Sequence, residues 1–325
     1  MDFQIKVLLL SFFITVILAL IIIPILKKLK IGQNERDDGP ESHMKKQGTP
    51  TMGGVIIMLA TVISAIGGVI YYYKDEINVA QNILPLLFIT FGFGLIGFID
   101  DFKKLVLKNT EGLKPMYKMI GLLIISVIFV LYLIKFVDVG TETYIPFLKI
   151  YIDMPIWIYI PFAIFVILAT TNAINLTDGI DGLAASISAI IITFLTVVSI
   201  MFDVKEITIF GTILIGACIG FLLFNMHTAK IFMGDTGSLL LGGVIAALSL
   251  YLKIPFLLII VAIIPILETL SVMIQVAYFK KTGKRILKMA PLHHHFELSN
   301  WKESKIVSIF SMITLIACII GLYAI

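Results

Sequence analysis

Long apolar stretches separated by short polar loops make up most of this chain. Ten such stretches lie near residues 5–26, 52–73, 83–100, 119–136, 155–171, 183–202, 207–224, 238–252, 255–279 and 306–324. Apolar runs of about 20 residues are long enough to cross a bilayer as helices, and only helices or closed barrels satisfy their backbone groups there. The pattern predicts an all-α, polytopic membrane protein with about ten transmembrane helices, built as a single domain over residues 1–325.

Three places depart from this simple pattern. The stretch at 238–252 is short, so we expect it to be tilted, shielded by its neighbours or longer than its apolar run. In the ninth stretch, Pro265 is expected to bend the helix. Glu268 follows at membrane depth, either packed against a neighbouring helix or supporting a site. The loop near 137–154 is predicted to form a short amphipathic hairpin on the outer side.

Composition and charge fix the class and the expected orientation. The chain is 59% hydrophobic and 14% charged, far from the roughly 25% charged residues of a soluble protein. With alternating loops, 19 of the 25 Lys and Arg residues fall on one side, which the positive-inside rule places in the cytoplasm, with both termini outside. The net charge of +4 is therefore explained by the lysines and arginines that set the orientation in the membrane. We expect no nucleic-acid partner. Cys218 and Cys318, both in apolar runs, are interpreted as packed thiols.

Polar residues that can carry chemistry gather on the predicted cytoplasmic side. They lie at the end of the third stretch (Asp100, Asp101) and in the loops at 172–182, 225–238 and 289–297. Carboxylates at a membrane boundary are costly to place there and usually serve a function. We therefore predict one active site built from inner loops and helix ends.

The residue types in this set favour magnesium and phosphate chemistry. Carboxylate oxygens are ligands for Mg²⁺ rather than zinc, and Mg²⁺ is commonly held by one or two carboxylates plus substrate phosphates. Lys103, Lys104, Lys118 and the Lys45–Lys46 pair could hold phosphate oxygens. The turn at 234–238 could present backbone amides to an anion at the start of a helix. A membrane enzyme that transfers a phosphate-bearing group to or from a lipid fits these features.

Four motifs carry a resemblance to a known family. They are Asp-Asp-Phe-Lys-Lys from Asp100, Asn-Leu-Thr-Asp-Gly-Ile-Asp-Gly from Asn175, Phe-Met-Gly-Asp-Thr-Gly-Ser from Phe232 and Ala-Pro-Leu-His-His-His-Phe-Glu from Ala290. With Gly-Thr-Pro-Thr-Met-Gly-Gly at 48–54, the chain resembles the polyprenyl-phosphate N-acetylhexosamine-1-phosphate transferases over nearly its whole length. The triple histidine followed by Phe-Glu is similar to the phospho-N-acetylmuramoyl-pentapeptide branch of that superfamily.

The resemblance implies roles residue by residue. It implies catalytic roles for Asp100, Asp101, Asp235, Lys104, Lys118 and His293, with Asp235 as the magnesium ligand. It implies substrate binding by Lys46, Thr51, Asn172, Asn175, Asp178, Gly179, Ile180, Asp181, Asn225, Phe232, His294 and His295. Where relatives often carry Ser-Lys-Gln-Lys, this chain has Pro-Met-Tyr-Lys ending at Lys118, so only the second lysine of that stretch is present.

The resemblance also implies a reaction. Phospho-MurNAc-pentapeptide would pass from cytoplasmic UDP-MurNAc-pentapeptide to undecaprenyl phosphate in the lipid bilayer, giving lipid I and UMP, with Mg²⁺ as cofactor. The expected location is the bacterial plasma membrane with a cytoplasmic active site, and the expected assembly is a homodimer. Asp100 is the candidate to orient or deprotonate the lipid phosphate. Direct displacement is favoured over a phospho-aspartate intermediate, because positioning and charge neutralisation suffice for phosphoryl transfer.

Two other functions remain open from the sequence. A sister transferase would move GlcNAc-1-phosphate to the same lipid, against which the histidine motif argues. A transporter would place acidic residues near mid-bilayer in discontinuous helices, whereas here they gather on one face. A purely structural membrane protein would leave the aspartate clusters unexplained.

Overall fold

The computed structural model describes residues 2–29, 48–105 and 112–325, and it confirms an all-α membrane protein. Ten helices in these ranges are long and apolar enough to cross a membrane. They are α1 (Asp2–Lys28), α3 (Gly54–Tyr72), α4 (Ile77–Leu105), α5 (Pro115–Lys135), α6 (Ile156–Thr177), α7 (Leu183–Met201), α8 (Lys205–Asn225), α9 (Gly234–Tyr251), α11 (Ile263–Thr282) and α13 (Glu303–Tyr323). Single-domain organisation stays a prediction.

Helix α9 lies at the centre of the bundle and packs against α3, α4 and α6. It has 18 residues, and nearly all of its side chains are buried. It begins at Gly234, four residues before the predicted stretch, so shielding by neighbours together with a misplaced boundary explains its short apolar run. A helix that lipid does not contact needs no continuous apolar surface, and this leaves room for polar residues in its first turn.

The ninth predicted stretch is divided rather than bent at its proline. A 3₁₀ turn, η1 (Pro255–Leu257), leads into α10 (Leu258–Val261), and the chain breaks at Ala262 before α11 begins. Pro265 therefore lies in the first turn of α11, where its missing N–H has no intrahelical acceptor to lose. The prediction of a bend at Pro265 was wrong in position, because proline is better tolerated at a helix start than in its middle.

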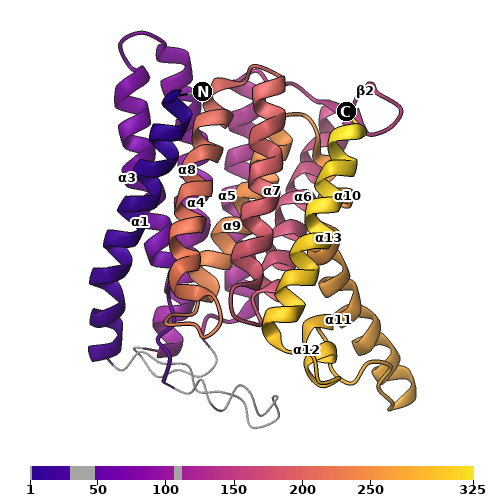
Figure 1. Cartoon of the computed structure of the whole chain (residues 1–325). Coiled ribbons are helices and arrows are strands. Elements are labelled where there is room, and N and C mark those ends of the chain that lie inside the picture. The colour runs from indigo at the N-terminus through magenta and orange to yellow at the C-terminus, as the bar shows by residue number, and fades with distance from the viewer. Residues whose placement is uncertain (1, 30–47, 106–111) are drawn as a thin grey trace.

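A small hairpin follows α5, as expected for residues 137–154. Strands β1 (Glu142–Ile145) and β2 (Ile150–Asp153) pair antiparallel, with Glu142 opposite Asp153. The hydroxyl of Tyr144 donates to the main-chain oxygen of Ile325 over 2.9 Å, which fastens the hairpin to the end of the chain. The start of α1 and the end of α13 lie at this same end of the bundle (Figure 1).

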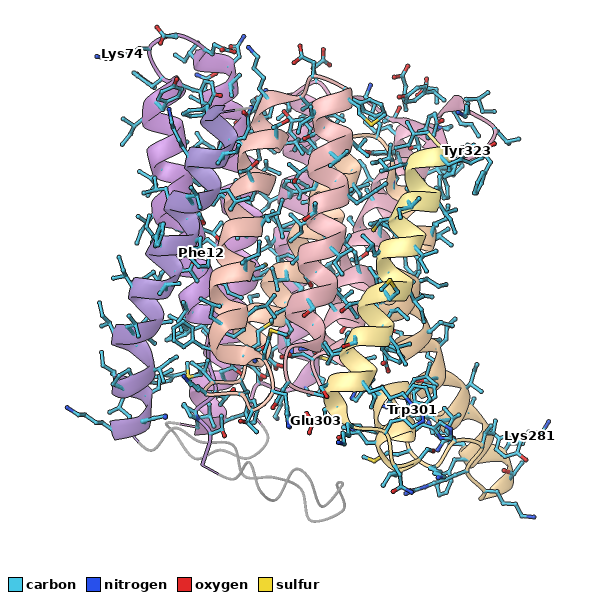
Figure 2. All side chains as sticks on the ribbon, viewed as in Figure 1. Phe12, Lys74, Lys281, Trp301, Glu303 and Tyr323 are labelled. Carbon is cyan, nitrogen blue, oxygen red and sulfur yellow. The ribbon has the colours of Figure 1, made fainter. Side chains whose placement is uncertain are left out.

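The opposite end of the bundle holds the polar motifs. Figure 2 shows Glu303 and Trp301 at this end, and Lys74 and Tyr323 at the end that carries the hairpin. Several residues predicted in loops lie in helices instead. Asn172 and Asn175 are in the last turns of α6, Asp235 is in the first turn of α9, and the three histidines form α12 (Leu292–Glu297). Which end faces the cytoplasm stays a prediction.

Candidate active site

A close approach of α4 to α9 brings the Asp100–Asp101 pair beside Asp235. Gly97 lies one turn before Asp100 and Asp101, and a Cβ added to Gly97 would be 2.2 Å from the main-chain oxygen of Asp235. No residue with a side chain fits at that distance. Glycine here therefore lets the last turns of α4 lie directly against the first turn of α9.

Two lysines and two aspartates form a compact charge cluster at this crossing. Lys104 Nζ lies 2.5 Å from Asp100 Oδ2 and 3.1 Å from Asp235 Oδ2. Lys118 Nζ, from the first turn of α5, lies 2.7 Å from Asp235 Oδ2 and 3.8 Å from Asp100 Oδ2. The Asp100 side chain is only 2% exposed, that of Asp235 18% and that of Lys104 38%, so this cluster is partly withdrawn from water. Its charges act through a lower dielectric than surface charges do.

The carboxylate of Asp101 is hydrogen-bonded to the start of α9. It accepts the Asp235 N–H over 3.1 Å, the Thr236 N–H over 2.9 Å and the Thr236 hydroxyl over 2.6 Å. The sequence predicted that amides of this turn would bind phosphate, but in the structure these two are already bonded to Asp101. A carboxylate is a suitable partner for free amides at a helix N-terminus, and it fixes α9 onto α4.

The end of α6 completes the polar cluster. Asn175 Nδ2 donates to Asp235 Oδ1 over 2.9 Å and to Ser238 Oγ over 2.8 Å. Asp178 follows at the end of α6. Burial raises the pKa of the Asp178 carboxyl well above its usual range, the Asp235 and Asp101 carboxylates raise it further, and a hydrogen bond from the Gly234 amide opposes them. The side-chain amide of Asn172 instead bonds the Leu168 oxygen of its own helix.

A second polar group lies where the loop after α6 meets the loop after α8. Asp181 Oδ2 accepts the Ala229 N–H over 3.1 Å and lies 3.4 Å from His227 Nδ1. Glu303 Oε2, from the first turn of α13, lies 3.9 Å from the same nitrogen. The Asn225 amide donates to Ile231 O over 2.9 Å and shapes the turn that leads to Phe232.

The early Gly-Thr-Pro-Thr motif packs beside Phe232. The Phe232 N–H donates to Pro50 O over 2.8 Å, and the Gly53 N–H donates to Phe232 O over 2.8 Å. Thr51 between them is buried. Thr51 lies beside the start of α9, since a Cβ added to Gly234 would be 3.1 Å from its hydroxyl oxygen, and its substrate-binding role stays a prediction. Lys46 lies outside the described residues.

The three histidines of α12 have different surroundings. His293 is buried, and its Nδ1 lies 3.2 Å from Glu268 Oε1 of α11. His294 Nδ1 lies 2.8 Å from Glu297 Oε2. His295 Nδ1 accepts the Lys288 N–H over 3.1 Å. His293 faces into the bundle, and the motif is therefore not a uniform substrate-facing surface.

Two groups in the described ranges have the composition of a cation site. Asp100, Asp101 and Asp235 each offer an oxygen, and Asp181, His227 and Glu303 offer a nitrogen and two oxygens, with the atoms of each group within 4.8 Å of one another. The first group fits a hard divalent cation, because all of its donors are carboxylate oxygens. The acidic groups therefore could bind a metal ion.

Sequence reasoning missed several partners in these groups. Thr236 and Ser238 stand in the quoted Gly-Asp-Thr-Gly-Ser motif, so their place beside Asp235 was the available signal. Glu303 and His227 gave no comparable signal, because a single charged residue at a helix start or in a loop usually has only a local role.

Comparisons with known proteins agree with the motifs. The family model described as Glycosyl transferase family 4 matches residues 83–253, and Phospho-N-acetylmuramoyl-pentapeptide-transferase signature 1 matches residues 46–58. A Phospho-N-acetylmuramoyl-pentapeptide-transferase from Acetivibrio thermocellus is 48% identical over 321 residues, covering 98% of this chain and 94% of the relative. A protein of the same name from Clostridium kluyveri is 49% identical over 313 residues, 96% of each chain. One from Clostridium perfringens is 48% identical over 311 residues, covering 96% and 95%.

Proposed function

Because the chain belongs to the phospho-N-acetylmuramoyl-pentapeptide-transferase family, we propose that it transfers phospho-MurNAc-pentapeptide from UDP-MurNAc-pentapeptide to undecaprenyl phosphate. A phosphate oxygen of the lipid forms a bond to the sugar-linked phosphorus of the donor. The bond from that phosphorus to the UMP oxygen breaks, and the products are lipid I and UMP. The protein lies in a bacterial membrane, and we place its active site on the cytoplasmic face, where the nucleotide donor is made.

The observation that carries this proposal is the cluster of Lys104, Lys118, Asp100 and Asp235. The reaction joins two phosphate-bearing substrates, so their mutual repulsion must be offset. Lys104 and Lys118 each lie within 4 Å of both aspartates, and a bound phosphate can draw their ammonium groups onto its own oxygens. Positive charge held at the reacting centre is the main contribution a protein makes to phosphoryl transfer.

Mg²⁺ is the cation we propose for this site. Asp235 would hold it, with Asp100 as the second carboxylate, because Asp101 already accepts three hydrogen bonds from the start of α9. When bound, the ion supplies Lewis-acid stabilisation of the charge that develops on the leaving UMP. Asn175 orients Asp235 through its 2.9 Å hydrogen bond.

Asp100 orients the lipid phosphate for attack. A phosphate monoester has a second pKa near about 6, so at pH 7 it is mostly a dianion and needs little help to lose a proton. We therefore favour a single displacement, with Asp100 and Lys104 aligning the nucleophile. A phospho-aspartate intermediate would instead make the kinetics ping-pong.

The loops beside this cluster are proposed to hold the nucleotide. Phe232, fixed by main-chain hydrogen bonds to the 50–53 segment, offers a flat ring on which uracil can stack. In the loop after α6, the Asp178 carboxyl accepts the Gly234 amide and Asp181 accepts the Ala229 amide, so both ends of that loop contact the segment that carries Phe232. The active assembly is proposed to be a homodimer, on the basis of the family.

The test is UMP release by purified protein in detergent with undecaprenyl phosphate and magnesium. UDP-MurNAc-pentapeptide and UDP-GlcNAc are supplied separately and in competition, with and without EDTA. We expect UMP release only from the muramoyl donor, abolished by EDTA and restored by added Mg²⁺. Release from UDP-GlcNAc alone would assign the chain to the sister activity, which its relatives do not favour. No release from either donor would overturn the proposal.

A further inference from the structure

Glu268 is a carboxylate in α11 with no exposure to solvent, and its environment indicates a role. Its Oε1 lies 3.2 Å from Nδ1 of His293, whose side chain is 1% exposed, and 3.3 Å from the main-chain N–H of His293. Nδ1 and Oε1 are within ion-pair distance, but the angles at the two atoms are not those of a hydrogen bond. Among the described residues, Glu268 Oε2 has no hydrogen-bond partner at all.

The other edge of the same imidazole supports the loop that follows α6. A Cβ added to Gly179 would lie 2.0 Å from Nε2 of His293, so the ring lies directly against the Gly179 backbone. In the described ranges Nε2 also lacks a hydrogen-bond partner. A continuous set of contacts thus runs from Glu268 through His293 to Gly179, between Asp178 and Asp181.

Burial explains why Glu268 and His293 act as a unit. A buried carboxylate is strongly destabilising unless a proton or a positive charge lies beside it. The imidazole is the partner that Glu268 contacts. Oε1 accepts the His293 main-chain N–H over 3.3 Å and lies 3.2 Å from Nδ1, and these two contacts hold the ring in place. A fixed ring in turn fixes Gly179, because neither the ring nor the backbone has space to move toward the other.

We propose that Glu268 is a positioning residue that acts through His293, and that the pair sets the Asp178–Asp181 loop to receive the nucleotide donor. This inference rests on the proposed function and deepens it. Neither side chain reaches the Asp100–Asp235 cluster through a described contact. The pair therefore affects recognition of the UDP-linked substrate more than the chemical step or recognition of the lipid phosphate.

The experiment compares KM for each substrate with kcat in a graded series. Glu268→Leu removes both charge and acceptor, and we expect it to raise KM for UDP-MurNAc-pentapeptide by about 10-fold, the lower end of the usual effect of such supporting residues. Glu268→Gln keeps an oxygen that can accept the main-chain N–H of His293, and it should recover a large part of that loss. KM for undecaprenyl phosphate should stay within about 2-fold of wild type in both variants, well below that supporting-residue effect.

A double variant tests whether the two residues act together. His293→Gln should raise the donor KM to a similar extent, and Glu268→Leu/His293→Gln should be no worse than the poorer single variant. Glu206→Leu is the matched control. It removes a carboxylate at the opposite end of the bundle, bonded to Tyr251 and Asn82, and should lower the thermal midpoint without changing either KM.

The outcomes separate this inference from the proposed function. Wild-type protein that releases no UMP would overturn both. Active wild type, with Glu268→Leu lowering kcat in proportion to its folded fraction and leaving both KM values unchanged, would overturn the positioning role alone. Additive losses in the double variant would show that Glu268 does not act through His293, and would overturn the inference in that form.

Discussion

The two ends of the helical bundle both contain hydrogen-bonded acidic groups, but they use them differently. At the end with β1 and β2, Glu206 accepts the Tyr251 hydroxyl and, over 3.1 Å, the Asn82 amide. At the site end, Lys104 and Lys118 share the oxygens of two aspartates. Glu206 of α8 is hydrogen-bonded to neutral side chains of α4 and α9, and these bonds hold the three helices together. We propose that the lysines at the site end exchange an aspartate oxygen for a phosphate oxygen when a substrate binds, whereas Glu206 has only a structural role.

The largest expected effect comes from Asp235→Asn. This change removes the proposed metal ligand while keeping side-chain volume and one oxygen, so we expect kcat for UMP release to fall at least about 100-fold. The measurement is initial rate over a magnesium titration, with the thermal midpoint as a check on folding. Activity within a few-fold of wild type would exclude Asp235 from the reaction.

Lys118→Met should have the next largest effect. It keeps the apolar stem but removes the ammonium group that lies 2.7 Å from Asp235, and we expect kcat to fall about 10- to 100-fold. Lys205→Met is the matched control, since Lys205 forms a 2.7 Å ion pair with Glu76 at the opposite end. That pair is solvent-exposed, so its loss should leave UMP release unchanged. Equal losses in both variants would contradict the comparison of the two ends.

Gly97→Ala should act through the fold rather than through charge. Its new Cβ would lie 2.2 Å from Asp235 O, so α4 and α9 must separate, at a cost of about 1–3 kcal/mol. Gly67→Ala in α3 is the control, because a Cβ there meets no atom within 4 Å. Thermal unfolding in detergent should show a lowered midpoint for Gly97→Ala only. An unchanged midpoint with full activity would show that the approach of α4 to α9 is not required.

The smallest effect is expected from Thr236→Val. Valine matches threonine in shape but loses the hydroxyl that donates to Asp101 over 2.6 Å, and we expect a destabilisation of about 1 kcal/mol. The main-chain amides of Asp235 and Thr236 still hold Asp101, so kcat should fall only a few-fold, within the range set by one neutral hydrogen bond. A loss as large as that of Asp235→Asn would indicate that the hydroxyl contacts substrate.

The sequence predicted the helices well because apolar length is a strong signal for a membrane span. It also placed Asp100, Asp235, Lys104 and Lys118 in one site, since all lie beside helix ends on the same side. It did not predict that Asp101 would accept hydrogen bonds from the main-chain amides at the start of α9. Those bonds depend on the close approach of α4 to α9, which Gly97 allows. The sequence left Glu268 open for a similar reason. A buried carboxylate is recognised as functional only when its partner, here His293 from a distant segment, is known.

The most direct test of the central claim is a binding titration with Mn²⁺, a paramagnetic stand-in for Mg²⁺. Free Mn²⁺ is followed by electron paramagnetic resonance in the presence of UDP-MurNAc-pentapeptide and without lipid acceptor. Wild type, Asp235→Asn and Glu206→Gln are compared at matched folded fraction. The account predicts that wild type and Glu206→Gln bind Mn²⁺ equally and that Asp235→Asn binds it far more weakly. Equal binding by all three proteins would contradict the assignment of the metal and phosphate chemistry to the Asp100–Asp235 end of the bundle.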